Sequence, residues 1–378
     1  MAVSPLTNAY KHTQEQQPDK IMLYGSSISY FTGKMEAYFR LKGLSYRLKP
    51  LTHPWLAKTI QKELGSSQMP AVRLPNGRWL TDTTAMIQWF ETQYPKNPVI
   101  PNSPELRFFS LLLEDYADEW LWRPAMHYRW HTPQGANFAA THLAHEIATG
   151  LPAPIVLKRW LLTRRQRKGF TTGDGVTPSN VSAVEAIYHR LLGVLSTILT
   201  QHKFLLGDQP SLADIGFAGP FLRHFAQDPV PAEIMRQDAP EVYEWASRLW
   251  NTQPGGGLGL LTSTPDTWAP LLEDIASVYL PYLNANAFAV QQGKKRFKVD
   301  LGGAVYPNAR ASHYRVFCLA QLRKHYMSLP EASKPDIKNK MEQHGLWEPL
   351  WAIESLPEYP ASTANLPFKT RGNMLDVY

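Results

Sequence analysis

The segment Leu23–Phe31, which reads LYGSSISYF, places a short apolar strand directly before a turn rich in hydroxyl groups. After the turn, Lys34–Leu41 carries apolar side chains at helical spacing, and Gly43 follows as a helix stop. A strand that leads through such a turn into a helix brings hydroxyl groups to the positive end of the helix dipole. The segment therefore predicts a buried strand followed by a place where an anion is favoured.

The pattern of short strands and helices continues to residue 95. A second strand, a helix, a hairpin and a third helix are predicted in the order Leu44–Leu48, Trp55–Leu64, Ala71–Leu80 around Pro75-Asn76-Gly77, and Thr83–Tyr94. The sum is a βαβαββα module over residues 21–95, preceded by a polar tail at residues 1–20. This order predicts an α/β, thioredoxin-like N-terminal domain.

The rest of the chain has helical periodicity. After the proline-rich linker that ends at Pro101, an all-helical domain is predicted over residues 103–254, with a less regular insertion at about 132–180. Its first helix begins at Ser103-Pro104 and is expected to run through Trp120 toward Trp130. Three glycines at 255–257 mark a boundary. Residues 255–378 are expected to form a mainly helical C-terminal extension with a hairpin around Gly302-Gly303.

Composition narrows the classes of protein. The chain has 378 residues, 44% of them hydrophobic, which is enough for two or three packed domains. Cys318 is the only cysteine, which excludes an internal disulfide and a cysteine-based zinc site and favours a cytoplasmic location. No stretch reaches the roughly 20 apolar residues of a membrane span.

Charge and histidine spacing give weaker signals. The net charge is +7, but basic and acidic residues mostly alternate, so no nucleic-acid partner is expected. One dense basic cluster lies at residues 158–168, and it suits either a solvated helix end or a patch for an anion or a membrane surface. The pairs His127/His131 and His142/His145 have helical spacing, but no glutamate completes a metal motif. We therefore expect no metal.

The segment Leu23–Tyr46 resembles the opening of soluble glutathione transferases, particularly the serine-type classes. The resemblance puts Ser29 at the position of the catalytic serine, where omega-like oxidoreductases have cysteine. A free thiol has a pKa of about 8.5, and lowering it by two units takes roughly 2.7 kcal/mol, which a hydroxyl and a helix N-terminus can supply together. Alternatively Ser29 only caps the helix. The hydroxyl groups of four other residues could donate to the thiol in place of Ser29, namely Ser26, Ser27, Tyr24 and Tyr30.

Two further motifs resemble the glutathione site of this family. Gln68-Met69-Pro70 matches the turn with a cis-proline, which would aim the Met69 backbone at an extended peptide; an ordinary trans proline is the alternative. Asp82-Thr83 matches the acidic-hydroxyl pair that, with a helix N-terminus, holds the γ-glutamyl end of glutathione. The alternative is a helix cap without a ligand. Met69, Pro70, Asp82 and Thr83 are thus candidate glutathione-binding residues.

A capping box at Ser211–Asp214, after Phe204–Asp208, resembles the family's helical-domain signature and carries a structural role only.

In the family, the second substrate binds between the domains against the first long helix. That helix carries an aromatic wall up to Trp130, and its candidate substrate-binding residues are Tyr116, Trp120, Arg123 and His127. The alternative is that these side chains form interdomain core.

The resemblance implies an enzyme that activates glutathione, as co-substrate, for attack on a small apolar or aromatic electrophile. It also implies a homodimer, unless residues 255–378 block or replace that interface. A non-catalytic scaffold or ligand-binding protein with the same fold is one alternative. A glutathione-dependent oxidoreductase is another, although a serine at position 29 cannot form the mixed disulfide that a cysteine would.

Overall fold

The computed structural model describes residues 20–51, 54–65, 68–255 and 259–358. The polar tail expected at residues 1–20 lies almost wholly outside the described residues, as do Gly256 and Gly257 of the expected boundary.

The N-terminal module is a four-stranded sheet with helices on both faces. Its elements are β1 (Ile21–Gly25), α1 (Tyr30–Lys42), β2 (Tyr46–Pro50), α2 (Pro54–Leu64), β3 (Ala71–Arg73), β4 (Trp79–Thr81) and α3 (Thr83–Gln93). The strand order is β2-β1-β3-β4, with β1 parallel to β2 and the other pairs antiparallel. The predicted βαβαββα order is confirmed.

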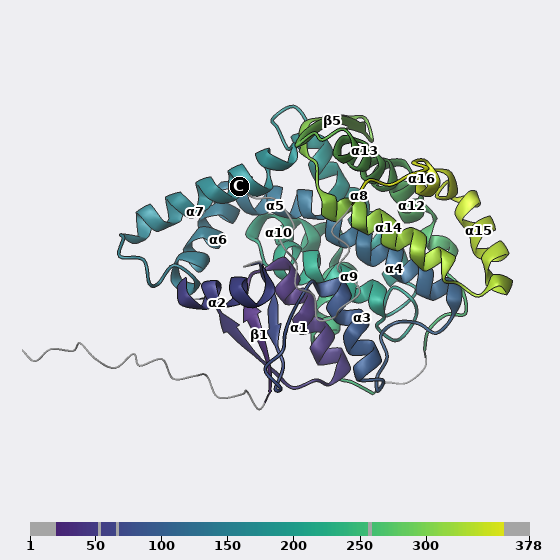
Figure 1. The fold of residues 1–378 in the computed structure, drawn as a ribbon, viewed down its shortest axis with the longest axis horizontal. Helices are drawn as coiled ribbons and strands as arrows, with labels where there is room; N and C mark the ends of the chain where they lie inside the picture. Colours follow the sequence, from purple (N-terminus) through teal and green to yellow (C-terminus); the bar gives the residue numbers. More distant parts are fainter. Residues whose placement is uncertain (1–19, 52–53, 66–67, 256–258, 359–378) are drawn as a thin grey trace, which may run out of the picture.

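Alternation along the strands decides which helix covers which face, because successive strand side chains point to opposite faces. Leu23 and Val72 pack in one buried cluster with side chains of α1 and α3. Their neighbours Tyr24 and Ala71 pack in another cluster with Leu56 of α2. One face is therefore covered by α1 and α3 and the other by α2 (Figure 1).

A helical domain follows the sheet module. It comprises α4 (Pro104–Glu119), α5 (Trp122–His131), α6 (Pro133–Glu146), α7 (Ile155–Phe170), α8 (Val181–Leu199), α9 (Leu212–Pro220) with a π-helical turn at Phe221–Phe225, α10 (Pro229–Asp238) and α11 (Pro240–Asn251). Helix α9 packs against both α4 and α1. At Gly216 a side chain would collide with the α4 backbone, since an added Cβ would lie 2.6 Å from Glu114 Cα.

The capping box at the start of α9 is present. Asp214 accepts a hydrogen bond from the backbone N–H of Ser211 at 2.9 Å. Its other carboxylate oxygen accepts from the Leu205 N–H at 3.0 Å and from the Trp245 indole at 2.9 Å. The carboxylate is fully buried, and burial raises its pKa above the ordinary value. Asp214 thus joins the start of α9 to the preceding loop and to α11.

Two expectations about the helical domain are wrong. The first long helix does not continue to Trp130, because it ends at Glu119 and a separate helix, α5, begins at Trp122. Residues 132–180 are more regular than expected, since they contain α6 and α7. Helix α7 has a weak sequence signal because only Gly169 is fully buried and only Leu162 and Phe170 among its large apolar side chains pack against a buried cluster.

The C-terminal extension is mainly helical. It contains α12 (Ala269–Asp274), a π-helical stretch (Ile275–Tyr279), α13 (Leu280–Gln291), β5 (Arg296–Leu301), β6 (Ala304–Arg310), α14 (His313–Met327), α15 (Lys334–Gln343) and α16 (Trp347–Trp351). The predicted hairpin is confirmed, and Gly302 and Gly303 both have positive φ at its turn. Helix α14 packs on α4, and α13 packs on α14 (Figure 1).

The extension shares one buried core with the helical domain. Tyr279 donates a hydrogen bond of 2.6 Å to Asp115 of α4, and Trp268 is buried with its indole bonded to Leu205. The extension is therefore part of the folded body and not an appended tail. In the described part of the chain, no helix is long and apolar enough to cross a membrane.

Candidate functional site

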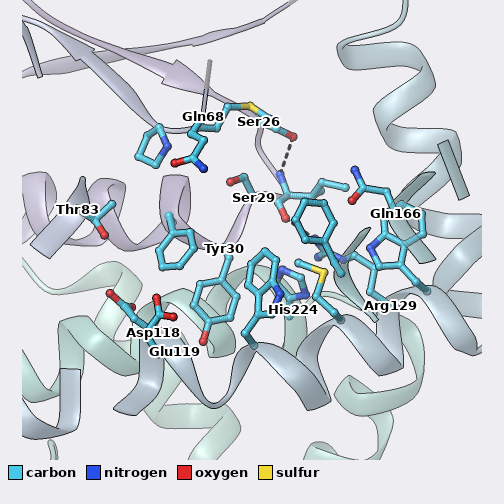
Figure 2. Close-up of a pocket in the computed structure, with 18 of the residues that line it drawn as sticks. Ser26, Ser29, Tyr30, Gln68, Thr83, Asp118, Glu119, Arg129, Gln166 and His224 are labelled. Carbon is cyan, nitrogen blue, oxygen red and sulfur yellow. Dashed lines mark hydrogen bonds between the residues drawn. The ribbon is translucent and has the colours of Figure 1, made fainter. Parts of the chain in front are cut away.

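A cavity of about 250 Å³ lies where the sheet module, the helical domain and the extension meet. It brings together the five residues expected to handle the thiol and the peptide, namely Ser29, Met69, Pro70, Asp82 and Thr83. Figure 2 shows Ser29, Gln68 and Thr83 around one side of this space, with Asp118, Glu119, Arg129 and His224 on the side formed by the helical domain.

Ser29 stands at the N-terminus of α1, and its hydroxyl makes no hydrogen bond to the described residues. Its backbone is extended (φ −80°, ψ 132°), as at a helix cap, but its side chain makes no capping hydrogen bond. Its carbonyl accepts from the Gly33 N–H at 2.9 Å, and its own N–H donates to the Ser26 carbonyl at 3.0 Å. The side chain is partly exposed and lines the cavity. The Ser29 hydroxyl is therefore positioned for a ligand near a helix N-terminus.

The neighbouring serines of the turn are held by α6. Ser26 donates its hydroxyl proton to Glu146, and the Ser27 backbone N–H donates to the same carboxylate at 2.9 Å. The Ser27 hydroxyl lies 2.7 Å from His142 Nε2. Both hydroxyls thus have partners within the chain, which makes them weaker candidates than Ser29 for binding a thiol.

The two tyrosines of this segment are also engaged. Tyr30 donates its phenolic proton to the Ala117 carbonyl at 2.6 Å, and burial raises its pKa well above 10. Tyr24 points to the other face of the sheet, where its ring stacks on Trp79 at 5.1 Å. A phenol that is buried and already donating is a poor source of a further hydrogen bond.

Met69 and Pro70 form the predicted cis peptide at the entrance to β3. Within the described ranges, no group is found hydrogen-bonded to the Met69 backbone, so its N–H and C=O remain available beside the cavity. Gln68, which sequence reasoning did not select, lines the same wall.

Asp82 occupies a strained position at the start of α3. Its φ is +72°, a region that non-glycine residues rarely adopt and that recurs at ligand sites. The carboxylate accepts from the Ala85 N–H at 3.4 Å, so it does cap the helix, although at a long distance. Burial raises its pKa to about 6, against the lowering effect of that bond and of Lys34. A cationic ligand group would stabilise its charged form.

Behind Asp82 lies a buried cluster of charges that joins α1 to α4. Lys34 pairs with Glu114 and Asp118 at 2.5 Å each, and Thr84 donates to Glu114 at 2.7 Å. One oxygen of Asp118 has no hydrogen-bond partner among the described residues, and burial raises the pKa of this carboxyl well above its usual range. Asp118 lines the cavity, so the floor of the site is acidic.

Arg129 of α5 holds the turn that carries Ser29. Its guanidinium donates to both oxygens of the fully buried Asp228, with the shortest bond at 2.8 Å. It also donates to the carbonyl of Ile28 at 2.5 Å and to that of Arg223. One arginine therefore connects α5, the start of α10 and the residue before Ser29.

The other end of the cavity is apolar and aromatic. Trp122, Met126 and Trp130 line it from one face of α5, at helical spacing i, i+4 and i+8. The Trp122 ring stacks on Phe31 at 5.8 Å and meets the edge of Phe170 at 5.4 Å. Arg165 and Gln166 of α7 complete this end.

The four expected substrate-binding residues lie outside this cavity. Tyr116 bonds to Asp274 at 2.9 Å, and the Trp120 ring packs against Tyr282 at 5.4 Å. The Arg123 guanidinium lies over the rings of Trp120 and Tyr282. The His127 imidazole hydrogen-bonds to Glu185 at 2.9 Å. Three of the four, Tyr116, Trp120 and Arg123, thus pack against residues of the extension.

The extension itself contributes to the cavity, which the sequence did not suggest. Tyr314 and Arg315 of α14 line it, and Arg315 pairs with Glu119 at 3.1 Å and with Asp174 at 3.5 Å. A hydrogen bond from the Tyr314 hydroxyl lowers the pKa of the Asp82 carboxyl, against the larger raising effect of burial. No motif in residues 255–378 pointed to this role. In the described ranges, no three His, Cys, Asp or Glu side chains gather as a metal site would require.

Comparisons with known proteins agree with this architecture. Residues 23–98 match the glutathione S-transferase N-terminal domain, and residues 170–253 match the glutathione S-transferase C-terminal domain. No curated protein sequence matches the chain significantly.

Solved structures that resemble the chain are distant. A glutathione S-transferase from Rhodospirillum rubrum is 20% identical, with 67% of this chain and 91% of that one covered and a TM-score of 0.41. A GST-like protein from Pseudomonas syringae is also 20% identical, covering 68% and 74% at a TM-score of 0.43. A Methylobacterium radiotolerans glutathione S-transferase, solved with glutathione sulfonate, is 18% identical, covering 61% and 90% at 0.37. Residues 23–98 and 170–253 of this chain are thus an N-terminal and a C-terminal domain of the glutathione S-transferase type.

Proposed function

We propose that this protein is a glutathione transferase in which Ser29 activates the thiol of glutathione. The observation that carries the proposal is the Ser29 hydroxyl, which lies in the cavity at the N-terminus of α1 without a capping bond. The same cavity holds the Met69 backbone on one side and Asp82 with Thr83 on another. A hydroxyl, a free backbone edge and an acidic-hydroxyl pair in one cavity together suit a short peptide that has a thiol in its middle and charged groups at one end.

In this proposal each part of glutathione has a partner. The backbone of Met69 pairs with the extended peptide, as in strand addition. The Asp82 carboxylate takes the γ-glutamyl ammonium, while the Thr83 hydroxyl and the N-terminus of α3 take the adjacent carboxylate. The Ser29 hydroxyl donates to the sulfur and stabilises the thiolate after the thiol proton has left to solvent.

The electrophile occupies the aromatic end of the cavity, against Trp122, Met126 and Trp130. The thiolate attacks its electrophilic carbon, a carbon–sulfur bond forms, and the leaving group departs with its electron pair. The apolar lining favours a small apolar or aromatic electrophile. We assign no substrate contact to Tyr116, Trp120, Arg123 or His127.

A homodimer in the cytoplasm remains part of the proposal, although the face of α4 that packs on α14 is not available to a partner subunit. Oxidoreductase chemistry has no support in the site. Position 29 is serine, and Cys318, the only cysteine, is buried with its pKa raised well above the usual value by burial and by nearby carboxylates.

Calorimetric titration of glutathione tests the proposal. Wild-type protein is expected to bind saturably, and Asp82→Ala is expected to bind about 10–100-fold more weakly, because a hydrogen bond to a charged group contributes roughly 1.5–3 kcal/mol. Asp300→Ala removes an exposed carboxylate of β5 and serves as the matched control, with unchanged affinity. Absence of binding at millimolar glutathione would reject the proposal in favour of a scaffold that keeps the fold alone.

The affinity for glutathione is expected to fall as the pH is lowered through about 6. Asp82 has a pKa of about 6 when folded and, in a free chain, about 3.9, and only its charged form attracts the ligand ammonium. Below pH 6 the affinity should drop about tenfold per pH unit. The same shift makes the folded state bind more protons, so Asp82 lowers stability as the pH rises from about 4 to 6.

Titrations at several pH values between 5 and 7.5 measure this dependence. Asp82→Asn keeps the shape of the side chain and should bind weakly with no pH dependence of its own in that range. The groups that face Asp82 are Lys34, Glu114 and Tyr314. The pKa of Lys34 is raised by the neighbouring carboxylates of Asp118 and Glu114, against the effect of its burial, and burial raises the pKa of Tyr314 well above its usual range, so neither of these two changes charge between pH 5 and 7.5. An equally steep pH dependence in Asp82→Asn would show that another group controls binding.

A further inference from the structure

Helix α7 presents an apolar face to solvent. Val156 is 71% exposed, Trp160 53%, Leu161 47% and Leu157 45%. Gly169 is the only residue of the helix that is buried. Figure 1 shows α7 at the outer edge of the molecule, running over α6. Four large apolar side chains within two helical turns form a contiguous patch, which monomeric proteins rarely leave in water without a purpose.

The same face becomes basic along the helix. Leu157, Leu161, Arg164 and Lys168 follow one another at i, i+4, i+7 and i+11, so they lie in one stripe. Arg164 and Lys168 are exposed, and the guanidinium of Arg164 lies 5.3 Å from the Trp160 ring. The helix has six basic residues and no acidic residue between positions 155 and 170. One half of the outward face is therefore apolar and the other half cationic.

We propose that this outward face of α7 docks the protein on the surface of an anionic lipid bilayer. A helix that offers aliphatic side chains and a tryptophan beside several cations lies well at the boundary between acyl chains and negatively charged headgroups. Trp160 has the amphipathic ring that favours this boundary.

Other occupants fit this face less well. A second copy of the chain, docked face to face through α7, would bring two strongly basic helices together without acidic partners on them, which costs electrostatic energy. A nucleic acid would satisfy Arg164 and Lys168 but would leave Val156, Leu157 and Leu161 without an apolar partner. An anionic bilayer satisfies both halves at once.

Docking through α7 would bring the cavity close to the bilayer. Arg165, Gln166 and Phe170, on other sides of the same helix, line the cavity, and Arg165 is exposed at its edge. If the proposed transferase function holds, apolar electrophiles dissolved in the membrane can enter the aromatic end of the cavity directly. The docking itself does not depend on that function.

Co-sedimentation of the full chain with vesicles tests the docking. One set of vesicles contains phosphatidylcholine with about a third phosphatidylglycerol, and the other contains phosphatidylcholine alone. We expect binding to the first set, at least tenfold weaker binding to the second, and a marked loss at about 0.5 M salt, because headgroup attraction is screened within a Debye length.

Two variants separate the two halves of the face. The triple variant Val156→Ser, Trp160→Ser, Leu161→Ser is expected to bind anionic vesicles at least tenfold more weakly. Arg164→Gln with Lys168→Gln is expected to bind anionic vesicles about tenfold or more weakly and with a smaller salt dependence than wild type. The matched control Phe288→Ser with Met327→Ser removes two equally exposed apolar side chains elsewhere and should bind as wild type.

Three results would overturn the docking proposal. They are no binding to anionic vesicles, equal binding by both α7 variants and the control, and α7-dependent self-association or nucleic-acid binding in place of vesicle binding. Thermal unfolding shows whether each variant is folded. Glutathione titration of the same samples reports the proposed function separately, because none of the substituted residues lines the cavity.

Discussion

Replacing Arg129 with methionine is expected to lower the free energy of unfolding by about 3–5 kcal/mol. The substitution leaves the carboxylate of Asp228 buried without its cation, and both side chains are almost completely inaccessible to water. It also removes the donors to the carbonyls of Ile28 and Arg223. Urea unfolding followed by tryptophan fluorescence measures the loss.

A double variant identifies the cause. Arg129→Met with Asp228→Leu removes both charges, and it should recover the part of the lost stability that is due to the unpaired carboxylate, because an apolar pair replaces the ion pair. The part due to the missing donors to the Ile28 and Arg223 carbonyls should remain. Arg236→Met is the control, since it breaks an exposed pair with Glu233 and is expected to leave the unfolding midpoint unchanged. A loss below about 1 kcal/mol in Arg129→Met would show that solvent reaches Asp228.

Ser29→Ala is expected to raise the pKa of the bound glutathione thiol by about one to two units. The reason is that a hydrogen bond to a charged group contributes roughly 1.5–3 kcal/mol. At pH 6.5 the thiolate fraction, and with it the rate of conjugation to a model electrophile, should fall about 5–50-fold. The loss should shrink as the pH rises past the new pKa. The ultraviolet thiolate band measures the pKa directly.

Ser27→Ala is the matched control, because Ser27 belongs to the same turn but its hydroxyl contacts His142 and does not line the cavity. Its bound thiol should titrate as in wild type. Glutathione affinity should change little in Ser29→Ala, since the serine acts on the thiolate and not on the peptide. If the bound thiol had the wild-type pKa in Ser29→Ala and a raised pKa in Ser27→Ala, the activation would be assigned to Ser27.

The grouping of Ser29, Met69, Pro70, Asp82 and Thr83 around one cavity could be predicted because the sequence signals for these residues are local. Ser29, Met69-Pro70 and Asp82-Thr83 each stand where a strand or turn meets the next element, and the order of elements brings such junctions to one edge of the sheet. The positive φ of Asp82 and the free hydroxyl of Ser29 are tertiary facts that no local pattern specifies.

The residues that the helical domain contributes to the cavity were harder to predict. Which face of a helix lines a cavity depends on the elements that pack against its other faces, and the sequence of the helix alone does not identify them. Residues 116–130 have aromatic side chains on several faces. The helix is interrupted after Glu119 and a new one begins at Trp122, so the helical spacing of α4 cannot be extended into α5. Trp122 and Met126 turned out to face the cavity. Tyr116 and Arg123 face Asp274 and Tyr282, residues more than a hundred and fifty positions away in the chain.

The contribution of α14 has a consequence for how the protein is made. Both family domains end by residue 253, whereas Tyr314 and Arg315 close one wall of the cavity. On the ribosome, a nascent chain that has released only residues 1–254 lacks Arg315, so Glu119 has not yet gained its buried cation. The cavity therefore acquires its complete lining only after α14 has left the exit tunnel.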